Sequence, residues 1–252
     1  MGVSSNSVIH FTNSLDAIKG ILKNNFRPKY CREYTLLDEC YSDILVPMVS
    51  FCDIPMSDIK EHIDKYGCYG VGLSKKWART SGLNPVLYID SNSHLNRSLE
   101  YVIRNFVANS NKDKTPLHEL DNDKLRMVDI VRYVKNYQED LIRKSETIPD
   151  YRFYDEREWR FVPEFSDEFR ACFDNTCIGD FKDEFEQSAK NLSKVRLMFN
   201  PEDINYLIIK EDREIHELIR FLKDDMGNEY SYKTIERLTT RILTTDQIRG
   251  DF

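Results

Sequence analysis

Two glutamates, Glu156 and Glu158, lie two residues apart in the stretch YDEREWRF at residues 154–161. On a β-strand they would share one charged face with Arg160, and the opposite face would be largely apolar. The ordinary explanation is a half-buried strand whose charged face is solvated. Two carboxylates beside aromatic residues also suit chemistry on a positive centre, because one can be held fixed in a cleft with the other beside it. The stretch is therefore a candidate catalytic site.

A second candidate lies near the start of the chain, in SVIHFT at residues 7–12. On a strand, His10 and Thr12 share one face, while Ile9 and Phe11 share the other. A lone histidine near a strand end is more often a structural hydrogen-bonding group than a site residue. A histidine and a threonine side by side are better suited to binding a ribose or an amide.

Bulk composition narrows the class of protein. The 252 residues are 40% apolar, which indicates a folded globular protein, and the formal net charge of −7 argues against unspecific binding of nucleic acid. Six scattered cysteines form no C-x-x-C pair, so neither a zinc site nor a disulfide framework is expected, and no metal is predicted. With no signal sequence and no membrane-length apolar run, we expect a cytoplasmic protein without membrane contact.

Several elements can be assigned from periodicity and capping residues. A strand at residues 7–12 precedes an amphipathic helix at 15–23, and residues 27–42 read as a polar turn region. The remaining predicted elements are strands at 44–54, within 66–78, at 85–90, at 195–200 and at 204–209, helices at 56–65, 75–80 and 214–223, and a last strand at 234–243.

Residues 91–148 differ in composition from their surroundings. Apolar residues recur there at helical spacing, and basic residues such as Lys135 alternate with acids, which is typical of a solvated helix face. We therefore expect a single α+β domain over residues 1–252, with a helical insertion at about 91–149, flanking helices and a mixed or antiparallel sheet.

Three short motifs follow one another in a fixed order: the triplet His10-Phe11-Thr12, the central Ser50-Phe51 with Tyr66 and Tyr69, and the late Glu156 and Glu158. This order resembles the ADP-ribosyltransferase superfamily, where an H-x-T motif, a Ser or Tyr motif and an E-x-E motif surround NAD. The stretch HFTNSLDAIKGILKNNFRP, followed by VPMVSFCDIPM, looks like the start of DarT-type DNA ADP-ribosyltransferase toxins. The resemblance implies a split β-sheet core of that superfamily's type.

The resemblance also implies catalytic roles. Breaking the bond between ribose and nicotinamide develops positive charge on the ribosyl carbon, which a fixed carboxylate can stabilise. Glu158 would take that role, and Glu156 would orient or deprotonate the incoming nucleophile. The acceptor would be a macromolecule, with nucleic acid (RNA or DNA) favoured over protein.

The remaining roles concern NAD as co-substrate. His10 and Thr12 would grip the adenosine ribose, and the backbone of Phe11 would meet the nicotinamide amide. Ser50, followed here by Phe51 and Cys52 in place of a fuller S-T-S motif, would brace Glu158. Either Tyr69 or Tyr66 would stack on the nicotinamide ring.

A resemblance that covers more of the chain leads to a different function. SFCDIPMSDIKEHIDKYGCYGVGLSKKWA together with DEREWRF resembles the AbiGi family of bacterial abortive phage-infection proteins. Proteins of that family are labelled as antitoxins, which disagrees with an enzyme.

Three hypotheses follow from these resemblances. The first is a NAD-dependent ADP-ribosyltransferase toxin of an anti-phage system, controlled by a cognate antitoxin or chaperone. The alternative is a non-enzymatic antitoxin that binds its cognate toxin. The third is a sensor that binds NAD without transferring ADP-ribose. The paired glutamates together with His10 favour the first hypothesis.

Overall fold

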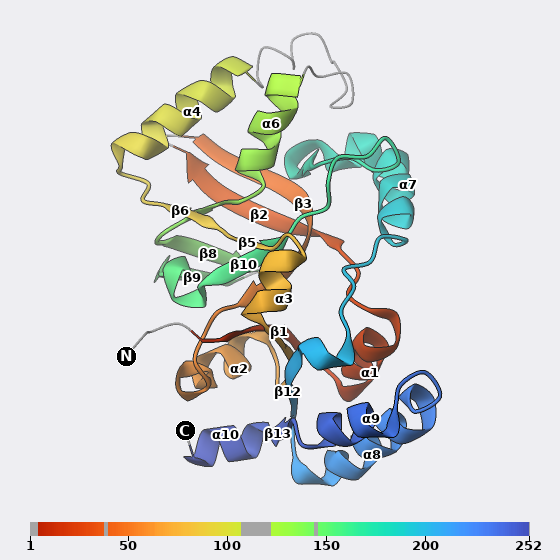
Figure 1. Ribbon diagram of the computed structural model, residues 1–252. Helices are drawn as coiled ribbons and strands as arrows, with labels where there is room; N and C mark the ends of the chain where they lie inside the picture. The colour runs from red at the N-terminus through yellow and green to blue at the C-terminus, as the bar shows by residue number, and fades with distance from the viewer. Residues whose placement is uncertain (1–4, 38–39, 107–121, 144–145, 252) are drawn as a thin grey trace. The chain divides into compact units, whose positions relative to one another are not determined.

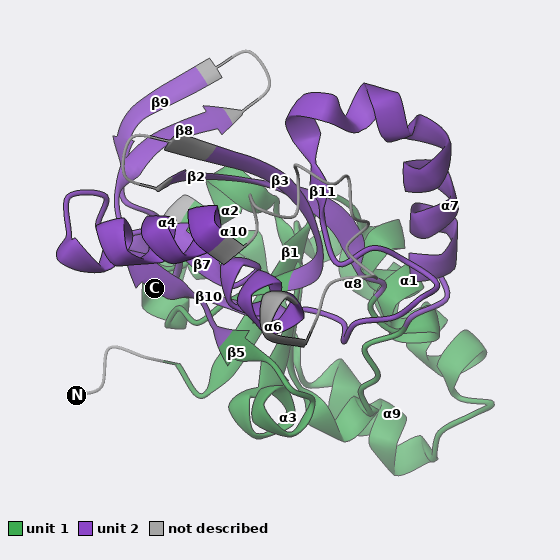
Figure 2. Cartoon of the chain, turned by 90° about the horizontal axis from the view of Figure 1, so that it is seen from above, with its two compact units in different colours: residues 1–26, 50–84, 196–252 green, residues 27–49, 85–195 purple. Residues whose placement is uncertain are grey.

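The computed structural model describes residues 5–37, 40–106, 122–143 and 146–251, and it has a mixed α+β architecture (Figure 1). The chain divides into two compact units (Figure 2). Unit 1 contains residues 1–26, 50–84 and 196–252, and unit 2 contains residues 27–49 and 85–195. The α+β prediction is confirmed. The ADP-ribosyltransferase-like sheet and the single domain over residues 1–252 stay predictions.

Unit 1 is built on a mixed sheet. Its strands lie in the order β13 (Ile242–Thr244), β12 (Ile204–Ile209), β4 (Tyr69–Ser74) and β1 (Ser7–Thr12). Strands β12 and β1 both run antiparallel to β4, and β13 runs parallel to β12. Ile9 of β1 also pairs with Cys52, at the end of β3 (Cys40–Cys52). The strands predicted at 7–12 and 204–209 are found with the same bounds.

Short helices complete unit 1, and serine side chains cap several of them. Ser14 accepts a hydrogen bond from the amide of Ala17, and Ser74 accepts one from the amide of Trp77. The helical elements are α1 (Leu15–Asn24), α2 (Lys60–Tyr66), α3 (Lys75–Thr80), α8 (Ile215–Phe221), α9 (Tyr232–Thr239) and α10 (Thr245–Asp251), with 3-10 turns at Met56–Asp58, Pro201–Asp203 and Asp212–Glu214 and a π-turn at Leu222–Met226.

The last strand predicted at 234–243 is wrong over most of its length. Ser231 accepts a hydrogen bond from the amide of Thr234 and so starts helix α9, in which Ile235 and Leu238 bury one face. Their i, i+3 spacing fits a helix, and only the end of the predicted segment becomes a strand, β13.

Unit 2 is organised around a long hairpin. Strand β2 (Lys29–Leu37) pairs antiparallel with β3, from Lys29 opposite Met48 to Leu37 opposite Cys40. Strand β11 (Phe173–Asp174) also pairs with β3, and strand β10 (Glu158–Phe161) lies next to β3 in the sheet. The polar turn predicted at 27–42 is therefore wrong. Its polar residues pair across the hairpin, as in the two hydrogen bonds of 2.8 and 2.7 Å from Arg32 to Asp43.

The remaining elements of unit 2 include two small sheets. One pairs β6 (Leu87–Ile89) with β7 (Val134–Asn136) in parallel, and the other is the antiparallel hairpin of β8 (Glu139–Arg143) and β9 (Glu146–Tyr151). The helices are α4 (His94–Phe106), α6 (Asn122–Val131) and α7 (Lys182–Leu192), with 3-10 turns at Phe153–Glu156 and Asn175–Phe181; the short strand β5 (Asn84–Pro85) falls where the two units divide.

The helical region predicted at about 91–149 is found only in part. Helices α4 and α6 are present, and residues 107–121 between them lie outside the described part of the chain. Beyond α6 the chain forms strands. Val134 and Asn136 are buried while their neighbours are partly exposed, which is the two-residue period of a strand.

A glycine substitution tests the packing of unit 1. Gly67 has φ = 115°, and a Cβ there would lie 2.3 Å from the backbone oxygen of Thr12. We expect Gly67→Ala to lower the free energy of unfolding by about 2 kcal/mol or more, measured by urea unfolding. The control is Gly20→Ala within α1, where a Cβ meets nothing within 4 Å. It should raise stability by about 0.5–1 kcal/mol. Equal stability of the two variants would contradict this packing.

Candidate functional site

The two glutamates of the E-x-E stretch lie on different elements. Glu156 ends the 3-10 turn that starts at Phe153, and Glu158 begins β10. Between them Arg157 adopts a left-handed conformation, with φ = 44° and ψ = 52°, and its amide donates to the carbonyl of Tyr154 at 3.1 Å. Such a conformation is uncommon for a residue other than glycine. The strand predicted at 154–161 is therefore wrong for its first half, because the chain turns before Glu158.

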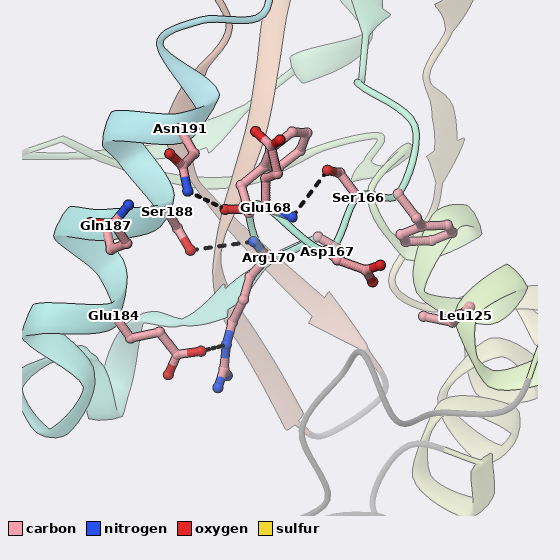
Figure 3. A pocket seen from close by; sticks show the side chains of 12 residues that line it. Leu125, Ser166, Asp167, Glu168, Arg170, Glu184, Gln187, Ser188 and Asn191 are labelled. Carbon is pink, nitrogen blue, oxygen red and sulfur yellow. Dashed lines mark hydrogen bonds and ion pairs between the residues drawn. The ribbon is translucent and has the colours of Figure 1, made fainter.

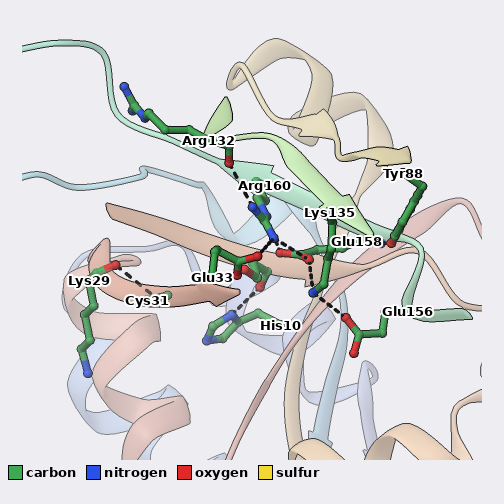
Figure 4. Close-up of polar contacts among 11 residues, drawn as sticks. His10, Lys29, Cys31, Glu33, Tyr88, Arg132, Lys135, Glu156, Glu158 and Arg160 are labelled. Carbon is green, nitrogen blue, oxygen red and sulfur yellow. Dashed lines mark hydrogen bonds and ion pairs between the residues drawn. The ribbon is translucent and has the colours of Figure 1, made fainter. Parts of the chain in front are cut away.

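The charged face of β10 points into unit 2. Glu158 is 5% exposed and Arg160 is 0% exposed, whereas Trp159 and Phe161 are only partly buried. The expectation of a solvated charged face is therefore wrong. Burying charges is costly unless they are paired, and the surrounding side chains supply that pairing (Figure 4).

Lys135 of β7 joins the two glutamates. Its Nζ donates to Glu156 Oε2 at 2.9 Å and to Glu158 Oε2 at 2.8 Å (Figure 4). The same atom lies 5.1 Å from the ring centroid of Phe153. Burial alone would lower the pKa of Lys135, but the carboxylates of Glu158 and Glu156 outweigh it and raise the pKa well above its ordinary value. Lys135 is therefore a charged bridge between the two acids.

Arg160 holds the other side of Glu158. Its Nε and Nη2 donate to the two carboxylate oxygens of Glu158, at 2.6 and 3.0 Å. Nη2 also donates to Glu33 Oε2 of β2 at 2.7 Å, and Nη1 donates to the carbonyl of Arg132 at 2.9 Å. This planar, forked geometry is one that arginine makes and lysine cannot.

The neighbouring cations keep Glu158 ionised. Burial would raise the pKa of Glu158, but Arg160 and Lys135 together hold it well below its usual range. Conversely, burial would lower the pKa of Arg160, and the carboxylates of Glu158 and Glu33 raise it instead. Three carboxylates thus share two cations. We call this set Glu33, Lys135, Glu156, Glu158 and Arg160 the buried ion network.

Hydrogen bonds outside the buried ion network fix its geometry. The amide of Glu158 donates to the hydroxyl of Tyr88 at 2.8 Å, and the Tyr151 hydroxyl donates to Glu156 Oε1 at 3.0 Å. Asn136, next to Lys135, bonds the backbone of Leu36 in both directions, at 2.7 and 3.0 Å. That pair of bonds ties β7 to β2, and so ties Lys135 to the strand that carries Glu33.

This arrangement suits a structural role. Both oxygens of Glu158 accept hydrogen bonds from Arg160, and one of them also accepts from Lys135. The negative charge of Glu158 is already compensated by Arg160 and Lys135, so less of it is available to stabilise positive charge that develops on a substrate. The network therefore joins β2, β7 and β10 within unit 2.

The residues predicted to bind NAD lie in unit 1. His10, Phe11 and Thr12 end β1, and Thr12 stands opposite Tyr69 of β4. His10 Nδ1 bonds the carbonyl of Ser50 at 2.8 Å, which fixes the ring. The pairing of β1 with β3 thus brings His10 and Ser50 together. This contact cannot be read from the sequence, where the two residues lie 40 positions apart.

The aromatic members of that set have contacts of their own. Phe51 is 1% exposed and packs against Phe26, Trp77 and His10, so its side chain belongs to the core. The hydroxyl of Tyr69 donates to Glu214 at 2.7 Å, and burial together with that carboxylate raises the pKa of Tyr69. Tyr66 stacks on His62.

The predicted catalytic residues belong to unit 2, whereas the predicted NAD-binding residues belong to unit 1. That the two sets surround one NAD stays a prediction, as do their roles. Sequence reasoning missed Lys135, which it placed on a solvated helix face, and Glu33, which it placed in a turn. Residues 133–137 alternate in burial but not between apolar and polar types, so the sequence carried no strand signal there.

Comparisons with known proteins point to phage defence. Residues 24–210 match the profile of a family described as "Putative abortive phage resistance protein AbiGi, antitoxin". The chain is also 27% identical over 241 residues to a protein of Lactococcus lactis subsp. cremoris named "Abortive phage resistance protein AbiGi". The aligned region covers 89% of this chain and 94% of that protein. No solved structure matches the chain.

These matches correct the functional prediction. The family is described as an antitoxin, so the prediction of an ADP-ribosyltransferase toxin is contradicted, and the antitoxin alternative fits the description better. An enzymatic activity and NAD as co-substrate stay predictions, and neither NAD nor a nucleic-acid acceptor gains support from the matches. Among the described residues, no helix is long and apolar enough to cross a membrane.

The first test of the buried ion network removes its central cation. Arg160→Met would leave Glu158 and Glu33 with one cation fewer in a buried site, and we expect the free energy of unfolding to fall by about 3–5 kcal/mol, measured by urea unfolding. The control is Arg152→Met, which removes the exposed pair with Asp155, 3.8 Å apart, and should leave stability unchanged. Equal effects of the two variants would contradict the network.

A second test uses pH. Because the pKa of Glu158 in the folded state lies below its unfolded value of about 4.3, the ionised carboxylate contributes stability above that pH, and this contribution is lost as pH falls through the folded pKa. Glu158→Gln should lower stability near pH 7 and should flatten the further loss between about pH 5 and pH 2. Urea unfolding across this range measures both effects. A slope identical to that of the wild type would show that folding does not lower the pKa of Glu158.

Proposed function

Because the chain belongs to the AbiGi family of abortive phage resistance proteins, we propose that it is the antitoxin of an abortive-infection pair and acts by binding a cognate toxin protein. The observation that carries this proposal is the family match over residues 24–210, which extends through both units. The 27% identity to the lactococcal protein, over nearly its whole length, supports the same assignment.

The contacts of Glu158 support a binding protein. The feature that first favoured an enzyme was the paired carboxylates, but their oxygens are engaged by Lys135, Arg160 and the hydroxyl of Tyr151. A buried carboxylate neutralised in this way has a structural role, because removing either partner would leave an uncompensated buried charge. An antitoxin requires a stable fold and a surface that binds the toxin, and its function does not depend on the pKa of a buried carboxylate.

The surface of unit 2 offers side chains suited to contact with a protein. On helix α4, Leu95 is 62% exposed and Tyr101 is 68% exposed, and Tyr154 beside the E-x-E stretch is 47% exposed. Tyrosine is enriched in protein interfaces because it combines a large apolar ring with a polar hydroxyl. Scattered exposed apolar residues are also common on monomers, so these positions support the proposal without defining an interface.

Growth assays test the function directly. Expressed alone in a bacterial host, the chain should leave growth unaffected. The protein encoded beside it in its genome should arrest growth when expressed alone, and co-expression of the two should restore growth and give a complex that co-purifies. Growth arrest by this chain alone, or rescue without any complex, would contradict an antitoxin that acts by binding.

Glu156→Gln provides the matched variant for that assay. The substitution keeps a side chain of similar size next to Tyr151 and Lys135, while Lys135 retains its contact with Glu158. Neutralisation of the toxin should therefore remain within about twofold of the wild type in variants that stay folded by circular dichroism, because the substitution changes a buried side chain and leaves the surface unchanged. Complete loss of neutralisation by the folded variant would assign the carboxylate pair a direct role.

A further inference from the structure

Unit 2 contains a cavity of about 460 Å³ that the proposed function has not used (Figure 3). Its walls are residues 165–171, one face of helix α7, and Leu125 of helix α6. This volume falls within the range of pockets that bind ligands, and such pockets combine an apolar floor with a few placed polar groups.

Helix α7 presents a polar stripe to the cavity. Glu184, Gln187, Ser188 and Asn191 are spaced i, i+3, i+4 and i+7, so they share one face of the helix, and all four line the cavity. The neighbouring face is apolar: Phe185 packs against Tyr30 and Phe173, with ring centroids 5.4 and 5.3 Å apart. The helix thus uses one face for the core and a second, polar face for the cavity.

The opposite wall supplies apolar surface. Phe169 is 8% exposed and Ala171 is 7% exposed, and both line the cavity. Ala171 packs in a cluster that also includes Phe165 and Leu125, two further lining residues. We call this apolar wall the floor of the cavity. It suits the methylene stem of a long side chain, since lysine and arginine place their stems on apolar surface while the charged end meets polar groups.

The charges around the cavity are mostly negative. The turn between Ser166 and Phe169 carries Asp167 and Glu168, whose side chains are exposed, and Asn191 holds the turn by donating to the carbonyl of Glu168 at 2.7 Å (Figure 3). Glu184 forms an ion pair with Arg170. Three carboxylates and one guanidinium give the described lining residues a net charge of −2, because Arg170 offsets only one of the carboxylates.

Arg170 is fixed in place and does not offer a site for an anion. Its Nε donates to Glu184, and its guanidinium carbon lies 5.4 Å from the ring centroids of both Phe173 and Phe181. With Asp167 and Glu168 on the same lining, an anionic ligand would meet net repulsion. A cation with an apolar stem meets attraction at the rim and apolar contact at the floor.

We propose that this cavity receives a lysine or arginine side chain from a surface segment of the cognate toxin, an inference that rests on the proposed antitoxin function. The stem would lie on Phe169 and Ala171, the charged end would meet Asp167 and Glu168, and the amide of Gln187 would be available to the backbone of the segment. A protein segment fits better than a small ion, because the volume accommodates a side chain together with part of its backbone.

Two double variants of the full chain test this assignment. D167N/E168Q removes the two exposed carboxylates of the turn, and the matched control D183N/E186Q removes two exposed carboxylates of α7 that do not line the cavity. Binding to the purified protein encoded beside this chain is measured by titration calorimetry at low and at moderate salt. We expect the dissociation constant to rise about 5- to 30-fold for D167N/E168Q, with a weaker salt dependence, and to stay unchanged for D183N/E186Q.

The possible results separate the two proposals. If the wild-type chain does not bind the neighbouring protein, both the proposed function and this inference are wrong. If it binds and D167N/E168Q binds equally well, only this inference is wrong. A thermal shift with spermidine that D167N/E168Q abolishes, with toxin binding unchanged, would overturn the protein segment in favour of a small cation. D167N/E168Q should keep the wild-type melting temperature, because neither carboxylate of the turn has a hydrogen bond or ion pair with another described residue.

Discussion

The structure of unit 2 depends on the contact between Arg160 and Glu158. Both side chains are almost fully buried, and desolvation of either alone would cost several kcal/mol. The forked contact of the guanidinium with both carboxylate oxygens offsets that cost, and Glu33 and Lys135 complete the pairing. Because the partners come from β2, β7 and β10, which do not pair with one another, the charges are satisfied only when these three strands pack in the positions they have in unit 2. The network therefore favours one packing of unit 2 over alternatives that an apolar core would tolerate.

The same contact changes what the E-x-E motif means in this chain. A pair of glutamates two residues apart indicates catalysis when one carboxylate is available to a substrate. Here the left-handed Arg157 turns the chain so that Glu156 and Glu158, on two different elements, both reach Lys135. The residue types of a catalytic motif are present, and their contacts are those of a scaffold. The family description as an antitoxin agrees with that assignment.

Local patterns predicted some of this structure and could not predict the rest. The bounds of β1, α3 and β12 follow from capping serines and short apolar runs, which act over a few residues. Strand β2 was missed because its polar residues are stabilised by partners across a hairpin, such as Asp43 for Arg32, and single-residue patterns do not contain that information. The buried ion network was missed for the same reason. Glu33 and Arg160 are 127 residues apart in sequence, and only the fold pairs them.

Unit 2 uses acidic residues in two ways that differ in the cations beside them. Within the buried ion network, Glu158 meets two cations and its charge is compensated. At the cavity beside α7, Asp167 and Glu168 lie on an exposed turn, and the nearby Arg170 already pairs with Glu184. Charges that the fold compensates stabilise it, and charges that it leaves uncompensated at a cavity remain available to a partner. In a chain with a net charge of −7, that difference separates the acids that hold the scaffold together from those that can recognise a basic segment.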